Sequence, residues 1–437
     1  MKTNSDDIHV VIIGAGFAGL WAVRTFFKKS VRVTVIDKNN YHTFLPLLYQ
    51  VGAAEIEPEQ IAFPIRSLLR NHKNINYLRS EVQKINFKDK TVECNNQIIN
   101  FDYLIIATGS TTTYYNIEGA KEIAFSLKTL DDAVILRNHI LSCFERASYC
   151  SDPVQRKKLL SFVIVGGGPT GIEFTGALSE LIKGPLKKDF TSISSEEITV
   201  SLIDSANRVL SMLSENLSLY AADKLTRMGV RVYLNSKVDR INSEGVFFTD
   251  GTSIPSESVI WTAGVKGETI DSDTELSMTG NARNRVEKSL QIKDFPFAYV
   301  TGDLTHFDFK GSPLPMIAPV AIQQGKHAAK NILRDISGEN QMDFVYSDKG
   351  SMVTIGRNSA VTEIGNKKFK GFTAWIIWIV IHILNLIGFR NKIFVLIHWI
   401  WDYIFFEKSV RLILPSCCSN PCAETCFKRG SCNPPTS

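Results

Sequence analysis

Two glycine-rich turns, each followed by an aspartate, carry the spacing in this chain that points most directly to chemistry. The first turn, GAGFAG at residues 14–19, follows an apolar run at residues 9–13 and opens a helical pattern. A second apolar run then ends on Asp37, eighteen residues after Gly19. Glycines permit a tight turn and a close approach to a pyrophosphate, which rests on the helix N-terminus, while the acid accepts ribose hydroxyls. The pattern predicts a βαβ unit that binds a dinucleotide.

The same pattern recurs at residues 162–204, where the turn GGGPTG spans residues 166–171 and Asp204 ends the following strand. The distance from the turn to Asp204 exceeds the usual spacing of about 20 residues. The surplus lies in the polar stretch 183–197, which we interpret as a loop insertion. An acid at this position favours the unphosphorylated ribose of NAD(H) over the 2′-phosphorylated ribose of NADP(H). Arg208 lies nearby in the sequence and slightly weakens this prediction.

Two dinucleotide sites in one chain suggest two nucleotides that exchange electrons. The elements that must position them include two further strands, residues 101–110 and 297–304, each of which ends in or contains Thr-Gly. A helix is expected from about residue 318, and Pro319 suits its first turn because the missing N–H is not needed there. The fold class predicted is α/β, with two Rossmann-like domains.

The composition sets the class of protein and the kind of surface. The chain has 437 residues, 44% hydrophobic and 21% charged, which is enough for two or three globular domains. Residues 366–411 hold seven Lys/Arg and two acids, so this segment accounts for the whole net charge of +5. A basic excess beside apolar residues favours an anionic membrane surface and disfavours nucleic acid. The start shows no secretory signal, so most of the eight cysteines should be thiols.

The apolar tail raises the question of a membrane. Residues 371–389 carry no formal charge, and residues 393–406 are similar after a basic break. Nineteen helical residues extend about 28 Å, close to a hydrocarbon thickness of about 30 Å, so a span is arguable from length. The flanking basic residues and four tryptophans instead favour helices that lie in the interface, while a buried oligomer interface is a third alternative.

Eight blocks of sequence together make a family resemblance specific. They are GAGFAGL (14–20), NNYHTFLPLLYQVGAAEIEPEQIAFPIR (39–66), ATGS (107–110), GGGPTGIEFTGAL (166–178), WTAGV (261–265), TGDL (301–304), IAPVAIQQG (317–325) and the amphiphilic tail. With these blocks the chain, to about residue 415, resembles the type II NADH:quinone oxidoreductases, which are flavoproteins with two dinucleotide-binding domains. The resemblance implies FAD and NADH as cofactors and amphipathic C-terminal helices that anchor the protein to a membrane.

The resemblance assigns cofactor roles residue by residue. It implies that FAD contacts Gly14, Gly16, Phe17, Ala18, Gly19, Asp37, Lys38, Thr108, Gly109, Asp303 and Ala321. It implies that NADH contacts Gly166, Gly168, Pro169, Thr170, Gly171, Asp204 and Gly264. No metal site is expected. The spacing of Cys418, Cys422 and Cys426 fits zinc poorly, so we interpret residues 417–437 as a disordered tail with incidental thiols.

Two residues are the expected catalytic groups, Glu173 and Gln323. Glu173 is expected near the nicotinamide and flavin, although an acid in a first helical turn is also favoured by the helix dipole alone. The resemblance places the quinone against Ala318, Pro319, Gln323 and Gln324. The family pattern has a glutamine where this chain has Pro319, which cannot donate a hydrogen bond, so Gln323 is the expected donor and Gln324 a substitute.

The resulting prediction is a respiratory NADH:quinone oxidoreductase that pumps no protons. Hydride passes from NADH to FAD, and two electrons then pass to a membrane quinone, menaquinone or ubiquinone. The expected domains are FAD-binding (1–116 and 279–336), NADH-binding (117–278) and quinone- and membrane-binding (337–416). A peripheral homodimer at the cytoplasmic face of the bacterial inner membrane is expected. The alternatives are a sulfide:quinone oxidoreductase, another pyridine-nucleotide reductase of this fold, and a non-catalytic redox sensor.

Overall fold

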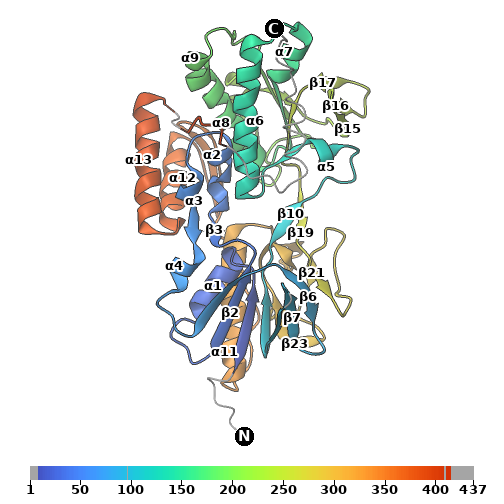
Figure 1. The fold of residues 1–437 in the computed structure, drawn as a ribbon, viewed down its shortest axis with the longest axis vertical. Helices are drawn as coiled ribbons and strands as arrows, with labels where there is room; N and C mark the ends of the chain where they lie inside the picture. Colours follow the sequence, from blue (N-terminus) through green and yellow to red (C-terminus); the bar gives the residue numbers. More distant parts are fainter. Residues whose placement is uncertain (1–7, 96, 408–409, 415–437) are drawn as a thin grey trace, which may run out of the picture. The chain divides into compact units, whose positions relative to one another are not determined.

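The computed structural model describes residues 8–95, 97–407 and 410–414. Contacts divide the chain into two units. Unit 1 holds residues 1–43, 62–111 and 265–349, and unit 2 holds residues 44–61, 112–264 and 350–437. The segment 44–61 therefore groups with the second unit, although it was expected in the FAD-binding domain. Figure 1 shows the elements of both units.

A six-stranded sheet forms the centre of unit 1, with strand order β22-β23-β9-β1-β2-β5. Its strands are β1 (His9–Ile13), β2 (Arg32–Asp37), β5 (Ile75–Arg79), β9 (Tyr103–Ile106), β22 (Gln291–Ile292) and β23 (Phe295–Val300). All neighbours are parallel except the β22–β23 pair. Every residue of β1 is buried, as expected for a parallel strand covered on both faces. The strands predicted from apolar runs in this half are confirmed.

A smaller sheet packs on one face of the first and shares its apolar core. Its strands are β6 (Val82–Asn86), β7 (Thr91–Cys94), β8 (Gln97–Asn100) and β20 (Asp271–Ser272). Helices α1 (Phe17–Thr25) and α11 (Ala318–Ile336) pack against each other. This packing requires glycine, because a Cβ on Gly325 would lie 2.0 Å from the Ala18 carbonyl oxygen.

Unit 2 repeats the plan with a five-stranded parallel sheet in the order β11-β18-β12-β13-β14. Its strands are β11 (Phe125–Ser126), β12 (Ser161–Val165), β13 (Thr199–Ile203), β14 (Arg231–Tyr233) and β18 (Ser258–Trp261). An antiparallel sheet of β15 (Val238–Asn242), β16 (Gly245–Phe248) and β17 (Ser253–Pro255) packs beside it, and the two share an apolar core. The predicted pair of Rossmann-like folds is thus confirmed.

Unit 2 also contains the helices α2 (Leu48–Gly52), α3 (Pro58–Ile61), α6 (Leu130–Tyr149), α7 (Pro153–Leu159), α8 (Pro169–Leu181) and α10 (Glu215–Arg227). Helix α2, in the segment 44–61, packs against α6 and α8. A capping box between Thr129 and Asp132 begins α6. The prediction of a loop at 183–197 is wrong for its first part. Helix α8 continues into η3 (Ile182–Leu186) and α9 (Lys187–Asp189) before the chain leaves the helix.

The shorter elements connect these layers. In unit 1 they are β3 (Tyr41–Thr43), β4 (Ala62–Pro64), α4 (Ile65–Leu69), β21 (Asn284–Arg285), η4 (Gly302–Leu304), β24 (Thr305–His306), β25 (Asp308–Phe309) and β26 (Ser312–Pro313). In unit 2 they are η2 (Leu45–Leu47) and α5 (Ala120–Ile123). Two further strands, β10 (Ser110–Thr112) and β19 (Val265–Gly267), lie where the chain passes between units.

The C-terminal part of unit 2 is a three-stranded antiparallel sheet followed by two helices. The sheet consists of β27 (Ser351–Gly356), β28 (Ser359–Ile364) and β29 (Lys367–Gly371), and the helices are α12 (Phe372–Asn385) and α13 (Phe389–Phe405). A single helix over the apolar run 371–389 is therefore not formed. Helix α12 ends at Asn385, and the chain turns at Gly388, which has φ +86°, before α13 begins. Among the described residues no helix combines the length and apolar character needed to cross a bilayer.

Candidate functional site

The first glycine turn forms a tight cradle at the end of β1. Gly14 has φ +96°, and an added Cβ would lie 2.3 Å from the Ala107 carbonyl oxygen. A Cβ on Gly19 would lie 1.8 Å from the Gly14 oxygen. Gly16, by contrast, is exposed, and a Cβ there would meet no described atom within 4 Å. Gly16 begins α1, and no described side chain caps this helix. These features fit the pyrophosphate of a dinucleotide.

Asp37, at the end of β2, is held by two backbone amides. Its Oδ2 accepts a hydrogen bond from Ala15 N at 2.6 Å, and its Oδ1 accepts one from Asn39 N at 2.7 Å. Burial raises the pKa of Asp37, and these bonds and the charge of exposed Lys38 act against that rise. Each carboxylate oxygen keeps a second lone pair, so the pair of oxygens can still accept ribose hydroxyls.

Asp303, a predicted FAD residue, follows the end of β23, and Gln324, a predicted quinone residue, bonds to the neighbouring Gly302. Ser110 Oγ donates to Asp303 Oδ2 at 2.5 Å. Gly302 N donates to Gln324 Oε1 at 2.8 Å, and the Gln324 side chain is 1% exposed. Gln324 Nε2 has no hydrogen-bond partner among the described residues. An unsatisfied buried amide is costly, so this N–H₂ fits a bound group that supplies an acceptor.

The other predicted FAD residues lie in unit 1 as well. Thr108 Oγ1 donates to the Glu268 carbonyl at 2.5 Å, and Glu268 N donates to the Gly109 carbonyl at 3.0 Å. The proton of the Thr108 hydroxyl is therefore used in a bond within the protein, and the hydroxyl could contact FAD only as an acceptor. Phe17, Ala18 and Ala321 are buried in the α1–α11 packing.

Gln323 does not present the hydrogen-bond donor expected of it. Its Nε2 donates to the Ser347 carbonyl at 2.9 Å, and its Oε1 accepts from Ser347 N at 3.0 Å. Both ends of the amide are therefore paired, and a bond from Gln323 to a quinone would first have to break this pair. Pro319 does occupy the first turn of α11, as predicted, next to Ala318.

The second glycine turn repeats the first in unit 2. Gly166 has φ +114°, and a Cβ there would lie 2.7 Å from Ala263 Cα. A Cβ on Gly171 would lie 1.9 Å from the Gly166 oxygen, while one on Gly168 would meet no described atom within 4 Å. Gly168 begins α8, and no described side chain caps that helix. Pro169 and Thr170 follow at the exposed helix start.

Asp204 makes the same pair of bonds as Asp37. Its Oδ2 accepts from Gly167 N at 2.6 Å, and its Oδ1 accepts from Ala206 N at 2.7 Å. Arg208, which weakened the prediction of NADH, is exposed and donates to the Ser211 carbonyl at 2.8 Å. Gly264 lies beside the Tyr115 ring, where a Cβ would come 2.1 Å from the hydroxyl oxygen.

Glu173 lies on α8, 9% exposed, at the wall of a cavity in unit 2. Burial raises its pKa to about 8, although the Thr354 amide, 3.5 Å from Oε1, and the neighbouring Trp378 indole lower it in part. The indole N–H itself makes no hydrogen bond of normal geometry with any described residue. A carboxyl group in this state holds its proton at neutral pH.

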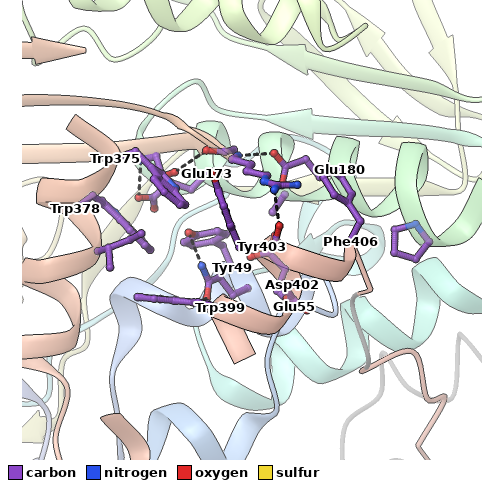
Figure 2. Close-up of a pocket in the computed structure, with 17 residues that line it drawn as sticks. Tyr49, Glu55, Glu173, Glu180, Trp375, Trp378, Trp399, Asp402, Tyr403 and Phe406 are labelled. Carbon is purple, nitrogen blue, oxygen red and sulfur yellow. Dashed lines mark hydrogen bonds between the residues drawn. The ribbon is translucent and has the colours of Figure 1, made fainter. Parts of the chain in front are cut away.

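The cavity encloses about 760 Å³ of empty space, part of it open to solvent. It has aromatic walls and four carboxylate groups (Figure 2). The aromatic residues are Tyr49, Trp375, Trp378, Trp399, Tyr403 and Phe406, and the acids are Glu55, Glu173, Glu180 and Asp402. Apart from Glu173, none of these residues was expected at a catalytic or binding site, and Trp375, Trp378 and Trp399 were instead expected at a membrane interface. The block 39–66 carried the family resemblance, but nothing in its spacing singled out Tyr49.

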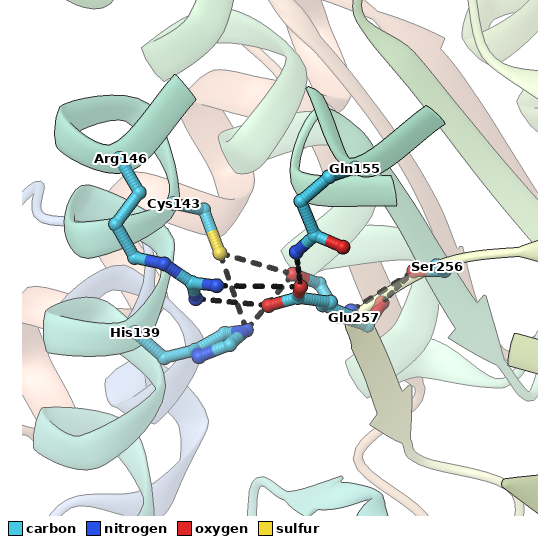
Figure 3. A network of polar contacts seen from close by, with 7 residues as sticks. His139, Cys143, Arg146, Gln155, Ser256 and Glu257 are labelled. Carbon is cyan, nitrogen blue, oxygen red and sulfur yellow. Dashed lines mark hydrogen bonds and ion pairs between the residues drawn. The ribbon is translucent and has the colours of Figure 1, made fainter. Parts of the chain in front are cut away.

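The cysteines described in this structure form no disulfide. Cys94, Cys143 and Cys150 are the three in the described ranges, and they are thiols. Cys143 is buried on α6, with Sγ 3.4 Å from His139 Nε2 and 3.6 Å from Ser258 Oγ (Figure 3). The neighbouring Glu257 forms an ion pair with Arg146 at 2.8 Å. This network joins α6 to β18, which is a structural role.

The described residues contain no cluster of His, Cys, Asp and Glu that could hold a metal ion. The Cys-rich segment 417–437 lies outside the described residues.

Comparisons with known proteins agree with this geometry. The pyridine nucleotide-disulphide oxidoreductase family matches residues 8–325. The type II NADH:quinone oxidoreductase Ndh of Mycobacterium tuberculosis is 37% identical over 408 residues, covering 90% of this chain and 87% of the relative. The Staphylococcus aureus type II NADH:quinone oxidoreductase is 31% identical, covering 84% and 92%. The structure of NDH2 from Plasmodium falciparum in complex with NADH has a TM-score of 0.85 at 21% identity, covering 93% and 100%.

The paired folds, the two cradles and the match over residues 8–325 place the chain in the pyridine nucleotide-disulphide oxidoreductase family. Its cofactors are FAD and NADH. Within that family, the identity and coverage shared with the curated relatives show that the chain belongs to the type II NADH:quinone oxidoreductases.

Proposed function

We propose that this protein transfers two electrons from NADH to a membrane quinone, without pumping protons, as a peripheral enzyme of the respiratory chain. The observation that carries the proposal is the identical bonding of Asp37 and Asp204. In both units the acid that ends the second strand accepts one bond from the glycine turn and one from the residue two positions later. One chain therefore contains two equivalent dinucleotide cradles, as a two-nucleotide electron relay requires.

The first cradle holds FAD in this proposal. The turn at 14–19 receives the pyrophosphate on the start of α1, Asp37 receives the ribose, and Asp303 offers a polar contact just after β23. FAD, when bound, supplies the chemistry by taking a hydride from NADH and giving two electrons to quinone. The protein binds, orients and tunes this group.

The second cradle holds NADH. Asp204 can accept both hydroxyls of an adenosine ribose, whereas a 2′-phosphate would bring two negative groups together. Arg208 donates its hydrogen bond to the Ser211 carbonyl, so we do not expect it to offset the preference of Asp204 for the unphosphorylated ribose. We expect NADH to be used in preference to NADPH.

Glu173 is the group that we propose handles protons. Its raised pKa of about 8 keeps the carboxyl group protonated at neutral pH, so the group can give a proton to a reduced quinone oxygen. Solvent then restores the proton through the cavity, which is partly open. For the second catalytic role we favour Gln324 over Gln323, because Gln324 Nε2 lacks a partner among the described residues and the Gln323 amide is paired with Ser347. Ala318 and Pro319 complete the proposed quinone-binding turn.

The C-terminal helices are the proposed membrane attachment. On α12 an apolar stripe is exposed at every fourth position, and a similar stripe runs along α13. The stripe residues are Phe372, Ile376, Val380 and Leu384 on α12, and Phe389, Ile393, Leu396, Ile397, Ile400 and Ile404 on α13. Exposed Arg390 and half-buried Lys392 lie where α13 begins, which suits anionic headgroups. We infer docking on the cytoplasmic face of a bacterial inner membrane, as a homodimer, with menaquinone or ubiquinone dissolved in the lipid.

An anaerobic mixing experiment tests the proposal. The yellow full-length protein is mixed with NADH, NADPH or sulfide in separate runs, and a short-chain menaquinone or ubiquinone analogue is then added. We expect fast flavin bleaching by NADH and prompt reoxidation by quinone. Bleaching by sulfide would instead support the sulfide:quinone alternative. Bleaching by NADH with no quinone turnover would support a redox sensor or a reductase with another acceptor.

A further inference from the structure

A chain of hydrogen bonds runs from helix α13 to the cavity that holds Glu173. Trp399 Nε1, on α13, donates to Gln50 Oε1 at 2.9 Å. Gln50 Nε2 donates to the Tyr49 hydroxyl at 3.0 Å. Gln50 and Tyr49 belong to α2, which packs against α8, the helix of Glu173. Figure 2 shows Tyr49, Trp399 and Glu173 at the same cavity.

Elementary hydrogen-bond chemistry fixes the direction of this chain. An indole N–H can donate but not accept, so the Gln50 oxygen must face Trp399 and the Gln50 N–H₂ must face Tyr49. The Tyr49 oxygen is therefore an acceptor in this pair, and its own proton has to point elsewhere. Among the described residues the Tyr49 hydroxyl makes its hydrogen bond with Gln50, so its proton is left for a group that enters or changes charge in the cavity.

The cavity offers that proton a negatively charged acceptor. Tyr49 is only 4% exposed, so water is largely excluded from its hydroxyl. Burial raises the pKa of Tyr49 well above its usual value, and the charges of Glu173, Glu55 and Glu180 add to the rise. Tyr49 therefore stays protonated as a donor, and Glu173 is the acid whose field acts on it most strongly.

We propose that Tyr49, held by Gln50 and Trp399, is a positioning residue that donates a hydrogen bond to the Glu173 carboxylate whenever Glu173 has given up its proton. This role rests on the proposed function, in which Glu173 supplies a proton to quinone. The Tyr49 proton stays on its own oxygen throughout. Glu173 loses one proton to the quinone oxygen, becomes a carboxylate stabilised by the Tyr49 O–H, and regains a proton from solvent.

Other titratable groups lie near Glu173 and could also affect its proton. Those that line the cavity are Glu180 on α8 itself, Glu55 after α2, Arg357 between β27 and β28, and Asp402 and Tyr403 on α13, while His382 on α12 stacks on Trp378 of the cavity wall. Burial lowers the pKa of His382 to about 4, so this side chain is neutral at pH 7. Replacement of Trp399 or Gln50 by an apolar residue changes none of these charges, so any effect on Glu173 must come through Tyr49 or through packing.

The titration of Glu173 can be measured directly by infrared spectroscopy of the full-length holoenzyme. The protonated carboxyl band of Glu173 is assigned as the band that Glu173→Gln removes. Its midpoint is then measured in the wild type, Tyr49→Phe, Gln50→Leu and Trp399→Phe. Each variant should raise the midpoint, by about one pH unit for Tyr49→Phe, since one hydrogen bond to a charged group is lost.

Trp401→Phe is the matched control, because Trp401 lies on the same helix, is 49% exposed and is not part of the chain of bonds. Equal midpoints in the wild type and in Trp399→Phe, or an equal shift in Trp401→Phe, would overturn the proposal. The infrared result does not depend on quinone turnover, so a protein that fails to reduce quinone but shows these shifts would contradict the proposed function alone. Thermal melting and flavin content show whether each variant is folded.

Discussion

Arg357, in the turn between β27 and β28, donates a hydrogen bond to the backbone carbonyl of Tyr403 in the last turn of α13. The same guanidinium lies 4.1 Å from the centroid of the Tyr403 ring and 4.3 Å from that of Phe406. The end of α13 is thus held at three points by one side chain on a sheet. A cation at a helix C-terminus also suits the helix dipole.

Replacement of Arg357 by alanine should release the end of α13. Loss of a charge-assisted bond and two ring contacts should cost about 2 kcal/mol of local stability. The loss of local stability in Arg357→Lys should be smaller than in Arg357→Ala but still measurable, because an ammonium group cannot stack and donate as a planar guanidinium does. Limited proteolysis within α13 measures the effect. Arg390→Ala removes an exposed arginine that contacts Phe394 on the same helix and should cleave at the wild-type rate. Equal cleavage in Arg357→Ala would contradict the role.

The raised pKa of Glu173 predicts a pH dependence of stability. The pKa is about 8 in the folded protein and 4.5 for an ordinary glutamate, so the folded state binds more protons between these values. The contribution of Glu173 is therefore fully present below pH 4.5 and is lost as pH rises through 8. Urea denaturation from pH 5 to about 8.5 should show a flatter profile in Glu173→Gln than in the wild type.

An exposed glutamate supplies the control for that measurement. Glu196→Gln changes the same group at the surface of unit 2 and should keep the wild-type profile. If Glu173→Gln and the wild type lose stability in parallel over this pH range, the raised pKa of Glu173 is wrong.

Asp37 and Asp204 make the same pair of hydrogen bonds but are proposed to bind different nucleotides. The same substitution at the two positions should therefore impair different steps, FAD retention at Asp37 and NADH use at Asp204. Asp204→Asn should lower kcat/KM for NADH about tenfold and raise the NADPH/NADH ratio, because one charge-assisted contact to ribose is lost. Asp37→Asn should instead reduce the FAD retained on purification and leave the NADPH/NADH ratio of the remaining holoenzyme unchanged. Steady-state kinetics and flavin absorbance measure both. A changed nucleotide ratio in Asp37→Asn would mean that the assignment of the two cradles is wrong.

The apolar stripe on α12 predicts weaker membrane attachment when it carries a charge. Leu384 is 68% exposed, and Leu384→Glu should lower partitioning into anionic phosphatidylglycerol vesicles at least about tenfold. NADH oxidation with a water-soluble quinone should be retained. Leu219→Glu makes the same change at a residue that is 61% exposed on α10 and should partition like the wild type. Equal losses in the two variants would point to general charge repulsion.

The local elements could be predicted because their signals are local. Runs such as residues 10–13 and 162–165 are apolar at every position, which is typical of a strand covered on both faces, and both lie in strands. The requirement for glycine in the two turns is partly local, since Gly14 and Gly166 have positive φ and added Cβ atoms on Gly19 and Gly171 would meet the carbonyl oxygens of Gly14 and Gly166. The aspartates follow one strand later and bond to those turns, so their spacing was informative.

Tertiary structure decided the rest, because it brings together residues whose separation in sequence carries no pattern. Gln50 and Trp399 lie 349 residues apart, yet they share a hydrogen bond. The amide of Gln323 is paired with Ser347, whereas Gln324 Nε2 has no partner among the described residues, and no sequence pattern predicts this difference between two adjacent glutamines. The pKa of Glu173 depends on burial behind the β27–β29 sheet and α12, which are more than 170 residues further along the chain. The amino-acid sequence alone determined which cradles exist, and the packing of distant segments determined which side chains in them remain available for chemistry.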